Sequence, residues 1–174
     1  QHFLVDENIA NRIVAAAEIT SGERILEVGP GRGVLTERLM PLGKLVAVEK
    51  DRWLAAVLRQ RFDGELLLIE GDALEVELPA ADVIVANLPY AISSPLLFRL
   101  FDVEWGRAVL MFQEEFARRL AALTLFAEIT PVWPYVPSEW NLADAATRGG
   151  RRVGVHHVSI RFVLHCGEHF AARL

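Results

Sequence analysis

A glycine-rich turn is the first feature of the chain that could do chemistry. The sequence EVGPGRG occupies positions 27–33, after an apolar, strand-like run and before a helical pattern. Glycines in that setting let the backbone turn tightly and approach a ligand closely. Because such turns also serve purely structural roles, Gly29 and Gly31 are candidate cofactor-binding residues only if neighbouring strand ends supply matching groups.

Two acidic residues supply such groups. Glu49 ends the next predicted strand, where a carboxylate can accept hydrogen bonds from both hydroxyls of a ribose. Asp72 lies in Gly71-Asp72-Ala73 after the third strand, where it and Ala73 can meet the adenine of a bound nucleoside. Either acid alone is more often a helix cap or a solvated loop residue. Their order at successive strand ends favours a nucleoside cofactor.

A third motif indicates that the site binds a methyl donor and not a dinucleotide. The sequence NLPY at 87–90 ends the fourth predicted strand, at the sheet edge where ligands bind in open α/β folds. The amide oxygen of Asn87 and the backbone carbonyl of Leu88 can accept the two N–H hydrogens of an adenine amine, which directs its lone pair toward a methyl sulfonium. Pro89 fixes the turn and Tyr90 offers a flat face to an extruded base. The structural alternative is a Pro-Tyr turn with a capping asparagine.

These motifs are positioned by alternating apolar strands and amphipathic helices. Asp6 or Asn8 can cap a first helix whose residues Ile9, Ile13, Val14 and Ala17 share one face. Buried strands are predicted at 24–28, 45–48, 66–69, 83–86 and 108–112, helices at 35–39, 52–61, 95–101 and 114–120, and two later strands at 123–130 and 158–164. This alternation predicts a parallel, doubly wound α/β sheet with helices on both faces.

Composition predicts one soluble globular domain. The 174 residues are 52% hydrophobic and 24% charged, enough to bury a core. The apolar runs are far shorter than the roughly 20 residues of a membrane helix, so we expect no membrane partner. One cysteine cannot form an internal disulfide, and with no signal-peptide pattern we expect a cytoplasmic location.

The net charge of −5 is unevenly distributed. Residues 1–114 hold 11 Lys and Arg against 18 Asp and Glu, whereas residues 115–174 hold 7 Arg against 5 acids. Basic groups at 118–119 and 148–152 are therefore candidates for contact with an RNA backbone. The alternative is that these arginines are merely solvated.

The motifs together resemble a known family, the ribosomal RNA adenine dimethyltransferases of the KsgA type. The resemblance rests on QHFL at 1–4, LEVGPG at 26–31, GDA at 71–73, ANLPYAISSP at 86–95 and LMFQEEFA at 110–117. It implies a Rossmann-like, seven-stranded sheet that uses S-adenosyl-L-methionine. It also implies that His2 and Leu4 line the cofactor site with Gly29, Glu49, Asp72 and Asn87.

The family's substrate follows from the same resemblance. It implies dimethylation of two adjacent adenosines near the 3′ end of small-subunit ribosomal RNA, during ribosome biogenesis. The expected partner is an immature small ribosomal subunit, and the expected state is a monomer.

The last part of the chain fits the family less well. We interpret residues 1–174 as one methyltransferase domain, with a strong match over 1–122 and a divergent end over 123–174. The family's basic, glycine-containing loop is not recognisable after Leu120, and its small helical C-terminal domain is expected to be missing. Two interpretations remain: the chain is a shortened one, or its end is genuinely divergent.

Other functions remain as alternatives. Antibiotic-resistance methyltransferases of large-subunit ribosomal RNA share the site but more often carry Ile where Leu88 stands. Protein-glutamine and DNA-adenine methyltransferases use related motifs but lack the QHFL start. The same fold also serves as a non-catalytic factor in ribosome assembly or transcription, which an intact NLPY motif disfavours.

Four histidines and the cysteine lie within positions 156–169 and are all types that bind zinc. Adjacent His156 and His157 would point to opposite faces of a strand, and neither a C-x-x-C nor a His-x-x-x-His pair is present. We therefore predict no metal site.

Overall fold

The computed structural model describes residues 7–87, 92–100, 102–113, 128–131 and 159–165. In chain order the elements are α1 (Glu7–Ala16), β1 (Arg24–Val28), α2 (Thr36–Leu39), β2 (Lys44–Glu49), α3 (Arg52–Arg61), β3 (Leu67–Glu70), β4 (Ala81–Asn87), α4 (Ser93–Leu100), β5 (Trp105–Gln113), β6 (Glu128–Pro131) and β7 (Ser159–His165). None of these described helices is long and apolar enough to cross a membrane.

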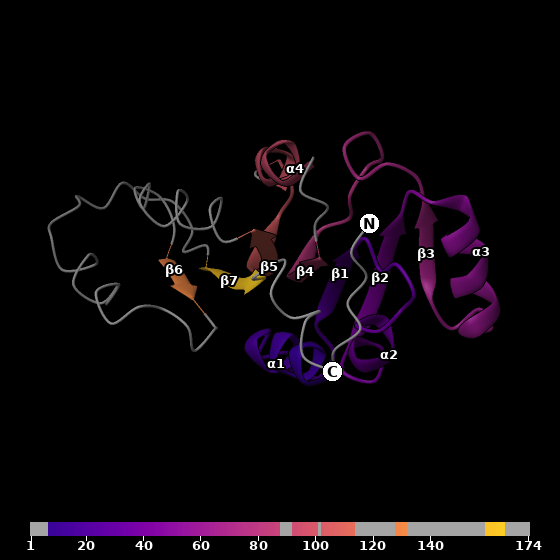
Figure 1. Ribbon diagram of the computed structural model, residues 1–174, viewed down its shortest axis with the longest axis horizontal. Helices are drawn as coiled ribbons and strands as arrows, with labels where there is room; N and C mark the ends of the chain where they lie inside the picture. Colours follow the sequence, from indigo (N-terminus) through magenta and orange to yellow (C-terminus); the bar gives the residue numbers. More distant parts are fainter. Residues whose placement is uncertain (1–6, 88–91, 101, 114–127, 132–158, 166–174) are drawn as a thin grey trace, which may run out of the picture.

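The body of the molecule is a parallel sheet in which β1 lies between β2 and β4. Strands β3, β2, β1, β4 and β5 lie in that order, and β7 and β6 continue it beyond β5 (Figure 1). Every neighbouring pair runs parallel. Val28 is in register with Val48 on one side and Ala86 on the other, so β1, β2 and β4 end at the same edge of the sheet.

Helices cover both faces of the sheet, as Figure 1 shows with α4 on one side and α1 and α2 on the other. Side chains alternate between the faces along each strand. Leu26 and Val28 of β1 pack in a core that includes Leu96 and Leu100 of α4. Ile25 packs in a second core shared with α1, α2 and Leu58 of α3. The even-numbered residues Leu26 and Val28 therefore lie on the face covered by α4, and odd-numbered residues of β1 lie on the face covered by α1 and α2.

Asp51 starts α3 directly after β2. Its carboxylate accepts the backbone N–H groups of Trp53 at 2.8 Å and Leu54 at 3.1 Å, which satisfies two donors that the first helical turn leaves unpaired. Since Asp51 follows Glu49 by two residues, this cap also sets the path of the chain away from the end of β2.

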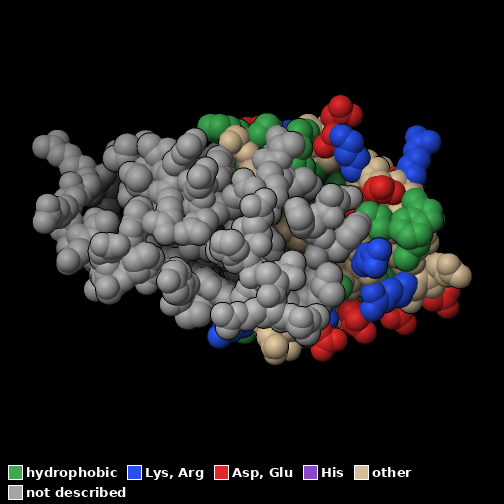
Figure 2. All heavy atoms as spheres, viewed as in Figure 1, with side chains coloured by type: hydrophobic (Ala, Val, Ile, Leu, Met, Phe, Trp, Pro, Cys, Tyr) green, Lys and Arg blue, Asp and Glu red, His purple; other side chains and the backbone are tan. Residues whose placement is uncertain are grey.

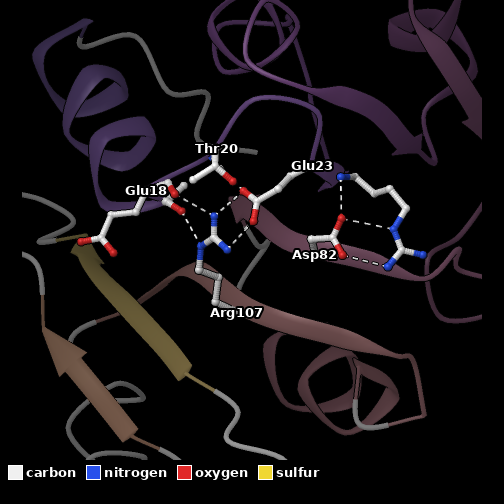
Figure 3. A network of polar contacts seen from close by, with 7 residues as sticks. Glu18, Thr20, Glu23, Asp82 and Arg107 are labelled. Atoms are coloured by element: carbon white, nitrogen blue, oxygen red, sulfur yellow. Dashed lines mark hydrogen bonds and ion pairs between the residues drawn. The ribbon is translucent and has the colours of Figure 1, made fainter.

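Two arginines join elements at the opposite edge of the sheet (Figure 3). Arg107 of β5 donates to the backbone oxygens of Ala17 and Glu18, just after α1, at 2.7 and 2.8 Å. The same guanidinium makes a two-pronged contact with the carboxylate of Glu23 at 2.9 and 2.6 Å. Arg24 and Asp82 join β1 to β4 in a similar way, at 2.8 Å.

The predicted elements compare well with the observed ones. A parallel sheet with helices on both faces is confirmed, and the predicted bounds of β1 and α3 are those observed. The prediction that residues 66–69 form a buried strand is wrong. β3 stands at an edge of the sheet and Leu67 is 64% exposed, because a neighbouring strand pairs on one side only.

Some predicted elements lie where the structure describes no residues. The predicted helix at 114–120 and most of the predicted strand at 123–130 lie outside the described residues. The family's seven-stranded arrangement, the divergent end at 123–174 and the missing helical domain stay predictions.

Candidate active site

The described part of the predicted site lies along one edge of the sheet. Turns or residues at the carboxyl ends of the first four strands hold the candidate residues Gly29, Gly31, Glu49, Asp72, Ala73 and Asn87. The other candidates, His2, Leu4, Leu88, Pro89 and Tyr90, lie outside the described residues. Four segments that are separate in the sequence, at the carboxyl ends of β1 to β4, are thus brought side by side by the parallel strand order.

The glycine turn after β1 requires glycine because of its backbone conformation. Gly29, Gly31 and Gly33 have φ angles of 73°, 59° and 83°, a region in which other residues are strained. A Cβ on Gly29 would lie 3.6 Å from the backbone oxygen of Asn87. The turn therefore lies directly against the end of β4 and leaves its backbone open to a ligand.

Glu49 is buried at the end of β2, with 3% of its surface exposed. One carboxylate oxygen accepts the N–H of Gly31 at 3.0 Å, and the other accepts the N–H of Asp51 at 2.9 Å. The side chain is thus fixed against the glycine turn. Because each carboxylate oxygen can accept more than one hydrogen bond, Glu49 retains capacity for two ligand hydroxyls.

Asp72 follows β3 and is held in the same manner. Its Oδ1 accepts the N–H of Leu74 at 3.0 Å, and its Oδ2 contacts the ammonium of Lys50 at 2.5 Å. The Lys50 ammonium and the Leu74 N–H keep the pKa of the Asp72 carboxyl below its ordinary value. Asp72 is therefore an ionised acceptor, suited to an amine donor. The side chain of the neighbouring Ala73 packs in the core, so it offers a ligand only its backbone.

Asn87 is the last residue of β4 and is half-buried. It is in register with Met111 of β5, and its backbone oxygen faces Gly29 across the end of the sheet. The arrangement brings Asn87 and Glu49 to the two sides of the glycine turn, since β4 and β2 flank β1. A ligand lying over the turn can contact both.

One residue of this edge was missed by the sequence interpretation. Glu27 of β1 is only 1% exposed, and its Oε2 accepts the hydroxyl of Thr36 on α2 at 2.7 Å. Its Oε1 is buried and has no hydrogen-bond partner in the described part of the chain. The available signal was an acid between the apolar residues Leu26 and Val28 of the strand RILEV, since burying an ionisable side chain in a core costs free energy.

Burial raises the pKa of Glu27 to about 8, with the charge of Glu49 adding to the effect and the Thr36 hydroxyl opposing it. A carboxyl in a water-poor site loses more by ionising than it does in solvent. Glu27 is therefore predominantly neutral at pH 7, while Asp72 is charged. Acids with pKa values shifted apart in this way are typical of functional sites.

The surface near α3 carries charges of both signs, as Figure 2 shows at the right of the molecule. Arg59 of α3 pairs with Glu70 at 2.7 Å, and Arg61 pairs with Glu37 at 2.6 Å. Interspersed pairs of this kind do not form a one-signed patch for a polyanion. The arginines predicted to meet RNA, at 118–119 and 148–152, lie outside the described residues. Of the five residues considered for zinc, only His165 is described, at the end of β7 in register with Gln113 of β5.

Comparison with known proteins identifies relatives over most of the chain. A sequence model of the family described as ribosomal RNA adenine dimethylase matches residues 1–129. A protein of Methanospirillum hungatei named "Probable ribosomal RNA small subunit methyltransferase A" is 48% identical over 128 residues, which cover 70% of this chain and 50% of that protein. The chain thus spans about half the length of the curated relatives it matches.

Two solved structures resemble the fold equally well. A dimethyladenosine transferase from Plasmodium falciparum has a TM-score of 0.65 at 40% identity, covering 68% of this chain and 46% of that one. The 23S rRNA methyltransferase ErmE also has a TM-score of 0.65, at 29% identity, covering 72% of this chain and 53% of that one.

Proposed function

Because this chain belongs to the ribosomal RNA adenine dimethylase family, we propose that it transfers methyl groups from S-adenosyl-L-methionine to the N6 amine of adenines in small-subunit ribosomal RNA. The single observation that carries this proposal is the placement of Glu49 and Asn87 on either side of the glycine turn. One anchors a nucleoside and the other orients an amine, at the same sheet edge.

The described residues fit the cofactor. The buried, doubly anchored carboxylate of Glu49 is rigid enough to hold a ribose through its two hydroxyls. Asp72 accepts the adenine amine, and the turn at Gly29 and Gly31, which has no side chains at these two positions, accommodates the methionine part. His2 and Leu4 complete the site. When bound, the cofactor supplies an electrophilic methyl group on a positively charged sulfur.

The target amine needs help because its lone pair is delocalised into the adenine ring. The amide oxygen of Asn87 accepts one N6 hydrogen and the backbone carbonyl of Leu88 accepts the other, so the lone pair is directed at the methyl group. Pro89 fixes this turn, and Tyr90 stacks on the extruded base. A neutral acceptor is sufficient, because the proton can leave after transfer. Catalysis then rests on orientation and on contacts made in the transition state.

The finer features belong to the same proposal. The sheet is the family's seven-stranded methyltransferase sheet, and residues 123–174 diverge from the family. The targets are two adjacent adenosines near the 3′ end of the RNA, presented by an immature small subunit to a cytoplasmic monomer.

Methylation of large-subunit RNA is the second candidate, because ErmE has the same TM-score as the dimethyladenosine transferase. The higher identity to the latter, 40% against 29%, and the names of the curated relatives favour the small subunit.

The deciding experiment offers the protein and radiolabelled cofactor to two substrates in parallel, an under-methylated small subunit and protein-free large-subunit RNA. The modified bases are then mapped. We expect N6,N6-dimethyladenosine in the small subunit alone. Label in large-subunit RNA only would establish the second candidate, and cofactor binding without transfer would indicate a non-catalytic factor.

A further inference from the structure

Glu27 shares its face of the sheet with the two proposed site residues, and lies beneath both. It is in register with Ala47 of β2 and with Val85 of β4. Glu49 and Asn87 each follow those partners by two residues, and a step of two keeps a side chain on the same face. Glu27 therefore lies one strand repeat, about 7 Å, below the level of Glu49 and Asn87.

No described group neutralises this carboxyl. From β2 it meets the like charge of Glu49, and from α2 the hydroxyl of Thr36. On β4 it is in register with the apolar Val85. The charged residues of α2 bond elsewhere, Glu37 to Arg61 and Arg38 to Asn11, and those of α1 are exposed. Among the residues that the structure describes, no cation therefore stabilises the ionised form of Glu27. A cationic ligand above the turn would supply the missing charge.

We propose that Glu27 is a specificity-determining residue that favours a sulfonium ligand over its thioether product. This inference rests on the proposed function, in which the methyl group must lie beside Asn87 and hence above Glu27. S-adenosylmethionine and S-adenosylhomocysteine differ by one methyl group and by the positive charge on sulfur. A buried carboxyl below that sulfur distinguishes the two by charge.

The mechanism is a linked ionisation. With a pKa of about 8, Glu27 is poised to lose its proton when a cation arrives. By reciprocity, an ionised Glu27 raises the affinity for the cation by the same factor. At about 7–10 Å and an effective dielectric constant of about 20, a unit charge pair changes an equilibrium constant by roughly tenfold or more. Residual screening reduces this to about three- to tenfold. The thioether carries no charge on its sulfur, so ionisation of Glu27 does not raise its affinity.

The experiment measures both affinities by calorimetry at pH 6.5 and pH 8.5. Four proteins are compared: the wild type, Glu27→Gln, Thr36→Val and the control Glu37→Gln, which removes an exposed carboxylate from α2. In the wild type and the control, the preference for the sulfonium over the thioether should rise about three- to tenfold between the two pH values. In Glu27→Gln only the part of this rise that comes from the ligands' own amino groups should remain. The ligands' own amino groups also titrate in this range, but their contribution is the same in all four proteins.

Thr36→Val keeps the test decisive if Glu27→Gln does not fold. It removes the hydrogen bond that lowers the pKa of Glu27, so the rise in preference should shift to higher pH. Repeating the titrations in buffers of different ionisation enthalpy should show that the sulfonium releases more protons than the thioether in the wild type.

The outcomes separate the two proposals. Should Glu27→Gln bind both ligands and keep the wild-type pH dependence, or should the wild-type preference not change with pH, the role of Glu27 is overturned while the cofactor assignment stands. Should the wild type bind neither ligand, the proposed function itself fails.

Discussion

The carboxylate of Glu49 accepts the backbone N–H of Gly31 at 3.0 Å, so the acid at the end of β2 is bonded directly to the turn after β1. The contact joins two parts of the proposed cofactor site before any ligand arrives. It also explains why a charged side chain that is only 3% exposed is tolerated there, since its second oxygen accepts the N–H of Asp51. Preorganisation of this kind reduces the ordering cost of binding.

Glu49→Ala should weaken binding of S-adenosylmethionine by about 1.5–3 kcal/mol, the scale of hydrogen bonds to a charged group. Calorimetry measures this, with Glu37→Ala as the matched control and circular dichroism to verify folding. An unchanged affinity in a folded Glu49→Ala protein would remove Glu49 from the cofactor site.

Asp72→Ala should cost less than Glu49→Ala, because a single contact to the adenine amine is lost. Lys50→Met should change the affinity by no more than about 1 kcal/mol, since its ammonium is largely exposed and exposed ion pairs contribute little. The same calorimetry ranks the three variants. A Lys50 variant more damaging than the Asp72 variant would make Lys50 the ligand-binding group instead.

Asn87→Ala should lower the rate of methyl transfer by about 10²–10³, by comparison with loss of one placed donor in an oxyanion hole. The orientation of the amine matters in the transition state more than in the ground state, so cofactor and RNA affinity should change little. Single-turnover transfer to an under-methylated small subunit measures the effect, with Asn11→Ala on α1 as control. Transfer at the wild-type rate would reduce Asn87 to a turn-forming residue.

Glu23 should stabilise the fold in a pH-dependent way. Its two-pronged hydrogen bond with Arg107 lowers the pKa of Glu23 from 4.5 to about 2. A lowered carboxyl pKa contributes stability that is present above pH 4.5 and is lost as the pH falls toward 2. The contribution is at most about 3 kcal/mol, at about 1.4 kcal/mol per pKa unit. Denaturant titrations should therefore show the cost of Glu23→Gln shrinking from pH 5 to pH 3, and a constant cost would contradict this.

Glu27 should act on stability with the opposite sign. Because its pKa is raised to about 8, the unfolded chain ionises at this residue from about pH 4.5 upward while the folded protein does not. Stability attributable to the neutral carboxyl is complete below pH 4.5 and is lost as the pH rises toward 8. Glu27→Gln, which cannot ionise, should gain stability relative to the wild type over that range, by as much as several kcal/mol. Thermal unfolding at pH 5 and pH 8 measures this. If the stability difference between Glu27→Gln and the wild type is the same at both pH values, Glu27 is not neutral in the folded protein.

The order of strands, turns and candidate residues could be predicted from the sequence, because it depends on local pattern. A buried parallel strand is a short apolar run, a turn with positive φ requires glycine, and Asp51 caps α3 through its own neighbours. Glu49 and Asn87 were recognised in this way, since each directly follows such a run. The resemblance to a family added His2 and Leu4, which local pattern alone does not identify.

Only the tertiary structure decided which of these groups meet, because the contacts join residues far apart in the chain. The pairing of β1 with both β2 and β4 places Glu27 beneath Glu49 and Asn87, and no local pattern sets that register. The contact of Lys50 with Asp72 depends in the same way on the order of β2 and β3. Burial is also a property of the whole fold. Leu67 of β3 is exposed because this strand lies at an edge of the sheet, whereas the acid in β1 is buried because strands and helices surround it. The raised pKa of Glu27, and the function proposed from it, follow from that burial.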